Sequence, residues 1–195
     1  MSSHEGRPEL VIVRHGETDW TVTGQHTSRT DIPLTPNGIQ QGEALGALLA
    51  GRRFRLVLTS PRHRAVDTCR RAGFGGQAVI SRDLEEWDYG EFEGRTTHEI
   101  RQEVPGWSIW RDGCPGGETA ADVGRRADRV IGEVRRGDGD VLAFAHGHNL
   151  RVLAARWVGL PPTEGRLMVL DTASLSVLGW EREAPVILKW NRTTD

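Results

Sequence analysis

The chain has 195 residues, a length that suits one α/β domain with a sizeable core, and we expect a single domain over residues 1–195. Its 25 basic and 27 acidic side chains leave a formal charge of -2, so the chain as a whole does not attract nucleic acid or an anionic membrane. The two cysteines, Cys69 and Cys114, are too few for a disulfide framework or a thiolate metal cluster. Without an apolar signal region or a run of membrane-spanning length, we expect a cytoplasmic protein.

Short apolar runs recur along the chain and predict buried strands. The runs at 9–13, 55–60 and 140–145 are rich in aliphatic residues, as is typical of parallel strands covered on both faces. Three further strands are expected near the C-terminus, at 167–170, 174–180 and 185–190. One of them is a candidate for an antiparallel edge strand of the sheet.

Helices are expected between these strands. A capping side chain followed by proline predicts helix starts at Thr35-Pro36 and at Ser60-Pro61. A third start at Thr119 has the spacing of a capping box. Strands that alternate with helices predict an α/β fold of three layers, a mainly parallel sheet flanked by helices on both faces. Residues 90–117 lose this periodicity and gather aromatic side chains, which suggests a short lid-like excursion or irregular packing.

Polar side chains follow three of the expected parallel strands. Arg14 and His15 come directly after the first, and Arg64 lies in the helix that follows the second. His146, in the tripeptide HGH of residues 146–148, comes directly after the third. Because the carboxyl ends of parallel strands meet at one edge, where helix N-termini also point, these groups should converge on one anion-binding pocket. On its own, the tripeptide fits a solvated loop or part of a metal site equally well, and a metal would need a third ligand.

The same motifs resemble the histidine phosphatase superfamily, which includes cofactor-dependent phosphoglycerate mutases and many phosphatases. The resemblance covers about residues 10–158 and follows the family order. It includes RHGETDW, GQHTSRTDIPLTPNG, LTSPRHRAVDT, EEWDYGEFEG, WSIWRDGCPGGE and FAHGHNLRVLAARWVGL. The later motifs are most similar to small acid phosphatases and a sedoheptulose bisphosphatase of the phosphoglycerate mutase branch. The resemblance implies a phosphoglycerate mutase-like fold.

The resemblance also implies roles for five residues. His15 would attack phosphorus and form a phosphohistidine. Arg14 and Arg64 would hold the phosphoryl oxygens, and they also disfavour the cationic form of His15, as an attacking imidazole requires. His146, expected to be protonated, would donate a further hydrogen bond. Glu86 would act as general acid and base, a role that spacing alone does not separate from the adjacent Glu85.

Further residues are expected to bind substrate or its phosphate. Thr21 and Ser28 depart from the mutase pattern, which has asparagine and glycine at these places. The threonine hydroxyl keeps the ability to donate to an oxyanion, whereas a side chain at Ser28 narrows the pocket mouth. His148 is expected either to line the pocket or to cap a helix, and His26 fits a surface or a site position. The full set is Thr21, Gln25, Thr27, Ser28, Tyr89, Gly147 and His148.

These motifs favour a metal-independent and cofactor-independent phosphatase acting on a small phosphorylated metabolite, such as a sugar phosphate, or on a broad acid-phosphatase range. Mutase activity is the alternative, but Trp87 and Asp88 stand where the mutases have basic residues, and water access looks easier here. Arg111 is a candidate for binding a second anionic group of the substrate, distant from the reacting phosphate. Trp107 and Trp110 are expected either to cover the substrate or to be structural residues.

Other functional classes fit less well. A non-catalytic phospholigand-binding module is disfavoured because all the catalytic residue types are present. A nucleotide-dependent oxidoreductase is disfavoured because no GxGxxG follows the first strand. Zinc-dependent hydrolysis stays formally open.

The arginine pairs, including 125–126, are expected on solvated faces and form no nucleic-acid patch. Pairing of two copies through an edge strand is compatible with the sequence but not required by it.

Overall fold

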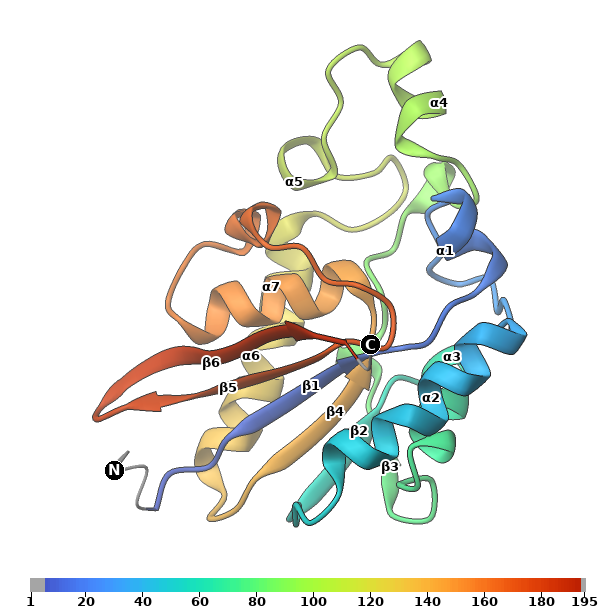
Figure 1. Cartoon of the computed structure of the whole chain (residues 1–195). Helices are drawn as coiled ribbons and strands as arrows, with labels where there is room; N and C mark the ends of the chain where they lie inside the picture. Colours follow the sequence, from blue (N-terminus) through green and yellow to red (C-terminus); the bar gives the residue numbers. More distant parts are fainter. Residues whose placement is uncertain (1–5, 194–195) are drawn as a thin grey trace.

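The computed structural model describes residues 6–193, which form a central sheet covered by helices (Figure 1). The strands are β1 (Leu10–Arg14), β2 (Leu56–Thr59), β3 (Ala78–Ile80), β4 (Val141–Ala145), β5 (Leu175–Glu181) and β6 (Ala184–Arg192). The helices are α1 (Asp19–Thr23), α2 (Pro36–Leu49), α3 (His63–Arg71), α4 (Thr97–Glu103), α5 (Ile109–Asp112), α6 (Ala120–Arg136) and α7 (Gly147–Trp157). Three 3-10 turns are η1 (Arg82–Leu84), η2 (Gly90–Phe92) and η3 (Pro162–Leu167).

The sheet runs in the order β3-β2-β4-β1-β5-β6. Its first four strands are mutually parallel, whereas β5 runs antiparallel to β1 and β6 antiparallel to β5. This arrangement confirms the predicted α/β class and the mainly parallel sheet. It also makes β1, β2 and β4 neighbours, so their carboxyl ends lie together.

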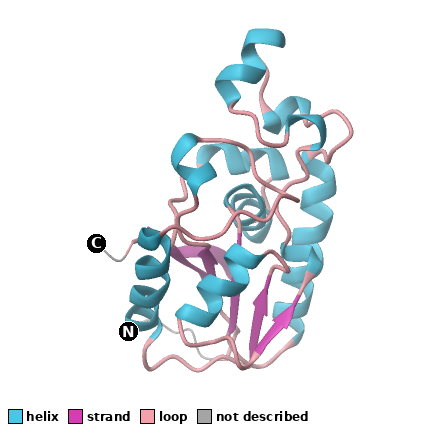
Figure 2. Cartoon of the chain, turned by 90° about the vertical axis from the view of Figure 1, so that its right-hand side faces the viewer, coloured by secondary structure: helices cyan, strands magenta, loops and turns pink. Residues whose placement is uncertain are grey.

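The core occupies both faces of this sheet, because side chains alternate along each strand. On β1, Leu10 and Ile12 join one cluster with α6 and α7, while Val11 and Val13 join another with α2 and α3. The three predicted layers are visible in two perpendicular views (Figures 1 and 2).

Residues 90–117 form a segment with two short helices, α4 and α5. It extends beyond the carboxyl edge of the sheet, on the side where α1 and the start of α7 lie (Figure 1). Its turn at Gly90 has φ +50°, and a Cβ there would lie 2.1 Å from the Pro115 carbonyl oxygen. Glycine therefore allows the two ends of the segment to approach each other closely.

Several local predictions are confirmed and two are wrong. Thr35 caps α2, and Thr119 forms the expected capping box at α6. The strand expected at 167–170 is absent, since this stretch is the end of η3 followed by coil. The helix expected from Ser60-Pro61 begins at His63, two residues after the proline, and its N-cap residue makes no side-chain cap bond.

Within residues 6–193, none of the helices combines the length and the apolar character that crossing a membrane requires.

Candidate active site

The candidate site lies where β1, β2 and β4 end side by side. The amide of His15 donates to the Ala145 carbonyl at 3.0 Å, and the amide of Ser60 donates to the Phe144 carbonyl at 2.9 Å. These bonds extend the sheet pairing by one residue. They hold the residues after each strand in fixed positions, as the parallel topology predicts.

His15 is held in one orientation by its own backbone. Its Nδ1 lies 2.8 Å from the Gly16 carbonyl oxygen, which only accepts, so Nδ1 carries the hydrogen and Nε2 keeps its lone pair. Burial, together with the Arg64 and Arg14 guanidiniums, lowers the pKa of His15 well below its usual value. The ring is therefore neutral near pH 7.

The guanidiniums of Arg14 and Arg64 are fixed by backbone carbonyls. Arg14 Nη1 donates to Leu170 at 2.6 Å, and Arg64 donates to Thr30 and Thr27 at 3.1 and 3.0 Å. Arg64 is fully buried. The Nε atom of each guanidinium is buried and has no hydrogen-bond partner within residues 6–193.

His146 packs edge-on against His15, with ring centroids 5.1 Å apart. Its Nε2 lies 2.7 Å from Ser60 Oγ, while its buried Nδ1 has no partner in the part of the chain that the structure describes. Burial, with Arg64 as the next cause, lowers the pKa of His146 well below its usual value. This direction favours a neutral His146 over the expected protonated ring, because a charged ring here would be desolvated beside three arginines.

Glu86 faces the start of α7. Its Oε1 accepts from the amide of Asn149 at 2.8 Å, and its Oε2 accepts from the amide of His148 at 3.1 Å. The N-cap residue of α7, His146, makes no side-chain cap bond, so Glu86 supplies the cap from a distant part of the chain. This arrangement separates Glu86 from Glu85, whose carboxylate pairs with Arg62.

Three loop residues predicted to bind phosphate line the cavity beside His15, namely Thr21, Gln25 and Thr27. In this conformation their polar groups bond within the protein. Thr21 Oγ1 donates to the Thr18 carbonyl, Thr27 Oγ1 donates to the Gln25 carbonyl, and Gln25 Nε2 donates to the Gly94 carbonyl. Each threonine hydroxyl would have to exchange its partner to donate to an oxyanion, whereas the Gln25 amide has a second N–H.

Ser28 does not reach the cavity. Its hydroxyl donates to Glu93 at 2.5 Å, and its amide donates to the same carboxylate. Burial would raise the pKa of Glu93, but the hydrogen bonds from Ser28 and Thr30 outweigh it and lower that pKa. Ser28 thus anchors the loop. Its hydroxyl accepts from the amide of Tyr89 at 3.4 Å, but Ser28 does not line the cavity beside His15.

The lining of the cavity also includes Tyr89, Gly147 and His148. The Tyr89 hydroxyl lies 2.7 Å from His148 Nδ1, so His148 lines the pocket and does not cap a helix. A Cβ on Gly147 would lie 3.4 Å from Nε of Arg14, which shows how closely that guanidinium passes over the start of α7. The whole cavity has a volume of about 200 Å³.

Comparison with known proteins agrees with this geometry. The profile of the histidine phosphatase superfamily (branch 1) matches residues 10–193. The chain belongs to this superfamily. An acid phosphatase of Mycobacterium tuberculosis is 42% identical over 176 residues, 88% of this chain and 86% of the relative. A sedoheptulose 1,7-bisphosphatase of Saccharomyces cerevisiae is 38% identical over 188 residues, 78% of this chain and 68% of the relative.

A solved structure gives the same result. The product of a Mycobacterium tuberculosis open reading frame matches with a TM-score of 0.91 at 38% identity, covering 96% of this chain and 99% of that one. Together with the phosphatase relatives, this match makes the chain a phosphatase of the histidine phosphatase superfamily, and such enzymes act on phosphorylated substrates.

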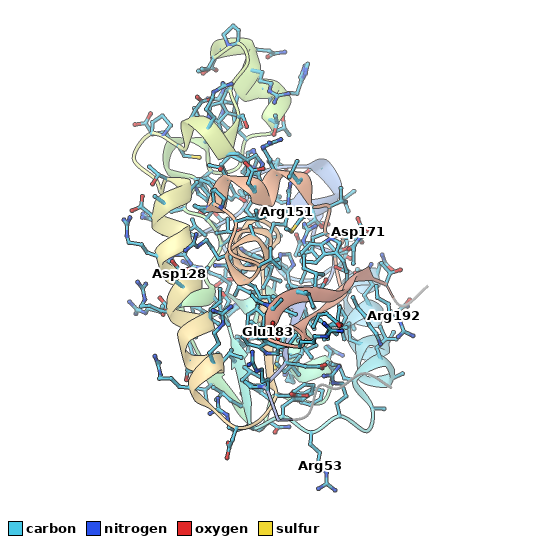
Figure 3. The ribbon with its side chains drawn as sticks, turned by 90° about the vertical axis from the view of Figure 1, so that its left-hand side faces the viewer. Arg53, Asp128, Arg151, Asp171, Glu183 and Arg192 are labelled. Carbon is cyan, nitrogen blue, oxygen red and sulfur yellow. The ribbon has the colours of Figure 1, made fainter. Side chains whose placement is uncertain are left out.

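In this histidine phosphatase, sequence reasoning pointed to Arg111 as a second cation, and the structure points to Arg151. Arg111 is largely exposed and its guanidinium pairs with the neighbouring Asp112. Arg151, labelled in Figure 3, belongs to α7 and lines the same cavity as His15. Its guanidinium lies 4.6 Å from the ring centre of Trp110, and its Nε donates to the Gly165 carbonyl.

His26 also lines the cavity of this phosphatase. Its ring lies 4.6 Å from that of Tyr89 and 5.7 Å from that of Trp107, and burial lowers its pKa to about 4. Trp107 itself is buried and donates to the Gly113 carbonyl, so it supports the wall from behind. Histidine spacing gave no signal for His26, because its partners come from segments more than sixty residues away.

Proposed function

We propose that this phosphatase hydrolyses phosphate monoesters of small metabolites through a phosphohistidine on His15. The proposal rests mainly on one observation: a neutral histidine able to act as nucleophile lies beside side-chain nitrogen atoms that have no hydrogen-bond partner. His15 offers a fixed Nε2 lone pair, and three buried nitrogen atoms, Arg14 Nε, Arg64 Nε and His146 Nδ1, have no partner among residues 6–193. Buried polar groups without partners are costly, and a bound phosphoryl group would satisfy them.

In the first step, Nε2 of His15 attacks phosphorus, the N–P bond forms and the bond to the leaving oxygen breaks. Charge on the transferring group is spread over its equatorial oxygens, where Arg14 and Arg64 donate. If Ser60 Oγ donates to Nε2 of His146, then Nδ1 of His146 carries a hydrogen and adds a third donor. A neutral His146 is sufficient for this role, since one N–H is all that the oxyanion needs.

Glu86 is proposed to carry the protons of both steps. Its carboxyl group lines the same cavity as His15 and is anchored at the start of α7. In the first step it protonates the leaving oxygen. In the second it takes a proton from water, which attacks phosphorus, breaks the N–P bond and releases inorganic phosphate.

The substrate is proposed to be small and to carry a second anionic group. A cavity of about 200 Å³ is smaller than the pockets of roughly 300 Å³ and more that hold drug-sized ligands. Arg151 presents a second cation on its wall, apart from the two arginines that surround His15. Sugar bisphosphates and phosphorylated acids have this combination of size and charge, and one relative is a sedoheptulose 1,7-bisphosphatase.

The direct test is release of inorganic phosphate from an aryl phosphate and from a panel of sugar phosphates, in EDTA, by wild type and His15→Ala. We expect release by wild type, inhibition by vanadate, and loss by a factor of about 10³ or more in the variant, because the covalent route is removed. Activity retained by folded His15→Ala would refute the proposed nucleophile. Exchange between 2- and 3-phosphoglycerate without hydrolysis would identify a mutase instead.

A further inference from the structure

Arg125 and Arg126 are adjacent on α6, yet their surroundings differ. The Arg125 side chain is 65% exposed and pairs with Asp122 on its own helix. The Arg126 side chain is only 13% exposed. The expectation that this pair lies on a solvated face is therefore wrong for Arg126, whose guanidinium is largely removed from water and requires hydrogen-bond partners within the protein.

The guanidinium of Arg126 binds the segment that carries Glu86. Its Nη1 donates to the carbonyls of Asp83 and Glu85, both at 2.9 Å, and its Nη2 lies 3.4 Å from the Glu86 carbonyl. Residues 85–88 belong to no helix or strand. Their backbone polar groups therefore rely on partners from elsewhere in the chain.

Glu118 completes the attachment on the other side of Glu86. Its two carboxylate oxygens accept from Nε and Nη2 of Arg126, each at 2.8 Å. The same carboxylate accepts from the amide of Asp88 at 3.0 Å, and the Glu118 carbonyl accepts from the Trp87 indole at 2.8 Å. The pair thus holds the backbone both before and after residue 86.

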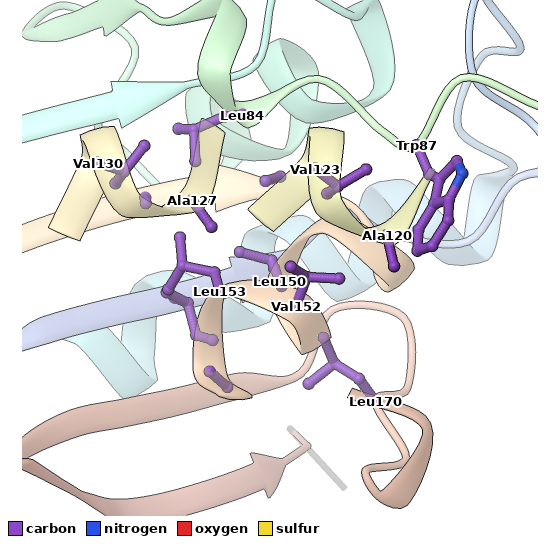
Figure 4. Packing of buried hydrophobic residues seen from close by; sticks show 14 of the residues in the cluster. Leu84, Trp87, Ala120, Val123, Ala127, Val130, Leu150, Val152, Leu153 and Leu170 are labelled. Atoms are coloured by element: carbon purple, nitrogen blue, oxygen red, sulfur yellow. The ribbon is translucent and has the colours of Figure 1, made fainter. Parts of the chain in front are cut away.

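Apolar packing fixes the same segment against α6. Val123 and Ala127 of α6 belong to one buried cluster with Leu84 and Trp87, which flank Glu86 (Figure 4). The packing sets the distance of the segment from α6, but apolar contacts are non-directional. The directional hydrogen bonds of Arg126 and Glu118 set its rotation, and with it the direction of the Glu86 side chain toward α7.

We propose that Arg126, together with Glu118, is a positioning residue for Glu86. It touches no substrate, and it acts by holding the carboxyl group within reach of the leaving oxygen. This inference rests on the proposed role of Glu86 as general acid. A displacement of about 1 Å at a reacting group lowers rates on the order of a hundredfold, so a loosened segment is expected to be visible in proton transfer.

The experiment compares two leaving groups. An alkyl phosphate such as glycerol phosphate needs a proton on its leaving oxygen, whereas para-nitrophenyl phosphate leaves as a stable anion. The quantity measured is kcat/KM, which reports the steps up to phosphoryl transfer, for wild type and Arg126→Lys. Lysine keeps the charge but lacks the planar fork that binds several carbonyls and a carboxylate together. The ratio of the two kcat/KM values is independent of how much enzyme is active.

We expect Arg126→Lys to lower kcat/KM for the alkyl phosphate by about tenfold or more and for the aryl phosphate by less than about threefold, because general acid catalysis contributes about 10² or more. Glu118→Gln, which keeps the shape but loses the charge, is expected to change the ratio in the same direction. The matched control is Arg125→Lys, whose ratio should equal that of wild type. Equal losses on both substrates, or no loss, in Arg126→Lys would overturn the inference.

Glu86→Gln separates this inference from the function on which it rests. If Glu86→Gln shows no selective loss on the alkyl phosphate, then Glu86 is not the acid and the proposed function fails at that point. If Glu86→Gln shows the selective loss and Arg126→Lys does not, only the positioning role of Arg126 is refuted.

Discussion

At the scale of single residues, His15 and His146 show how neighbouring imidazoles are given different properties. Both are buried beside the same arginines, and their pKa values are lowered for the same reasons. Their hydrogen bonds differ, because His15 donates from Nδ1 to a carbonyl while His146 bonds through Nε2 to the Ser60 hydroxyl. The sequence motifs predicted that these two histidines lie in the same site. Their protonation states depend on how deeply the rings are buried, which the motifs do not predict.

Arg151 is the residue at which substrate choice can be tested. Replacing it with methionine keeps much of its apolar stem against Trp110 and removes the charge. For a substrate with a second anionic group, we expect kcat/KM to fall by about 10- to 100-fold, the value of one lost charge-assisted hydrogen bond of about 1.5–3 kcal/mol. The loss should be smaller for para-nitrophenyl phosphate, which has no second anion. Steady-state kinetics on a bisphosphate and on the aryl phosphate measures both.

The control for Arg151→Met is Arg156→Met on the same helix. Arg156 pairs with Asp128 on the neighbouring α6 and does not line the cavity. Its kinetics should match wild type on both substrates. If Arg151→Met lowers kcat/KM equally for mono- and bisphosphates, Arg151 does not recognise a second anion.

At the scale of elements, the start of α3 shows why a local pattern can mislead. A capping residue followed by proline occurs at both Thr35-Pro36 and Ser60-Pro61, and only the first begins a helix at the proline. Ser60 Oγ lies 2.7 Å from His146 Nε2, so it takes part in the site as well as accepting from the Arg62 amide. A contact between residues 60 and 146 is set by the sheet, and local spacing does not predict it.

The loop after β1 is held against the first turn of α2 by a close backbone contact. A Cβ on Gly38 would lie 2.2 Å from the Glu17 carbonyl oxygen, and one on Gly16 would lie 2.5 Å from the Gly38 carbonyl oxygen. We expect Gly38→Ala to lower the free energy of unfolding by about 1–3 kcal/mol, as overpacking does, and to lower activity because the loop next to His15 must move.

Gly46→Ala in the same helix is the matched control for Gly38→Ala. A Cβ at Gly46 would lie 3.4 Å from its nearest neighbour, the Ala72 carbonyl oxygen, so the added methyl group needs little adjustment. Alanine also favours the helix over glycine by about 0.5–1 kcal/mol. Urea unfolding of both variants measures the difference, and equal midpoints would contradict the proposed close contact.

At the scale of the whole molecule, the parallel topology explains what the sequence could predict. The strand ends that carry Arg14, His15 and His146 meet because the sheet is parallel, and strand periodicity makes that visible in advance. The contributions of Arg126 and Arg151 could not be predicted in this way. They depend on how α6, α7 and the segment at 83–118 pack together. The residue spacing within each of these segments does not predict contacts between them.

The same burial that shapes the site also makes stability depend on pH. The pKa of His26 is lowered to about 4, and those of His15, His146 and His148 are lowered well below the usual value, by burial first in every case. In the unfolded chain each would take up a proton near pH 6.5. Below that pH the unfolded state binds more protons, so the free energy of unfolding is highest above about pH 6.5 and falls as the pH decreases toward the folded pKa values.

Each of these histidines contributes a slope of up to about 1.4 kcal/mol per pH unit once the pH is below its unfolded pKa. We therefore expect the urea midpoint to fall clearly between about pH 7.5 and about pH 5.5, a window above the range in which Glu93, with its lowered pKa, takes up a proton. Inorganic phosphate in the buffer should offset part of the fall, because it binds the folded site alone. A midpoint that stays constant across this window would mean that the four rings are not held neutral in the folded protein.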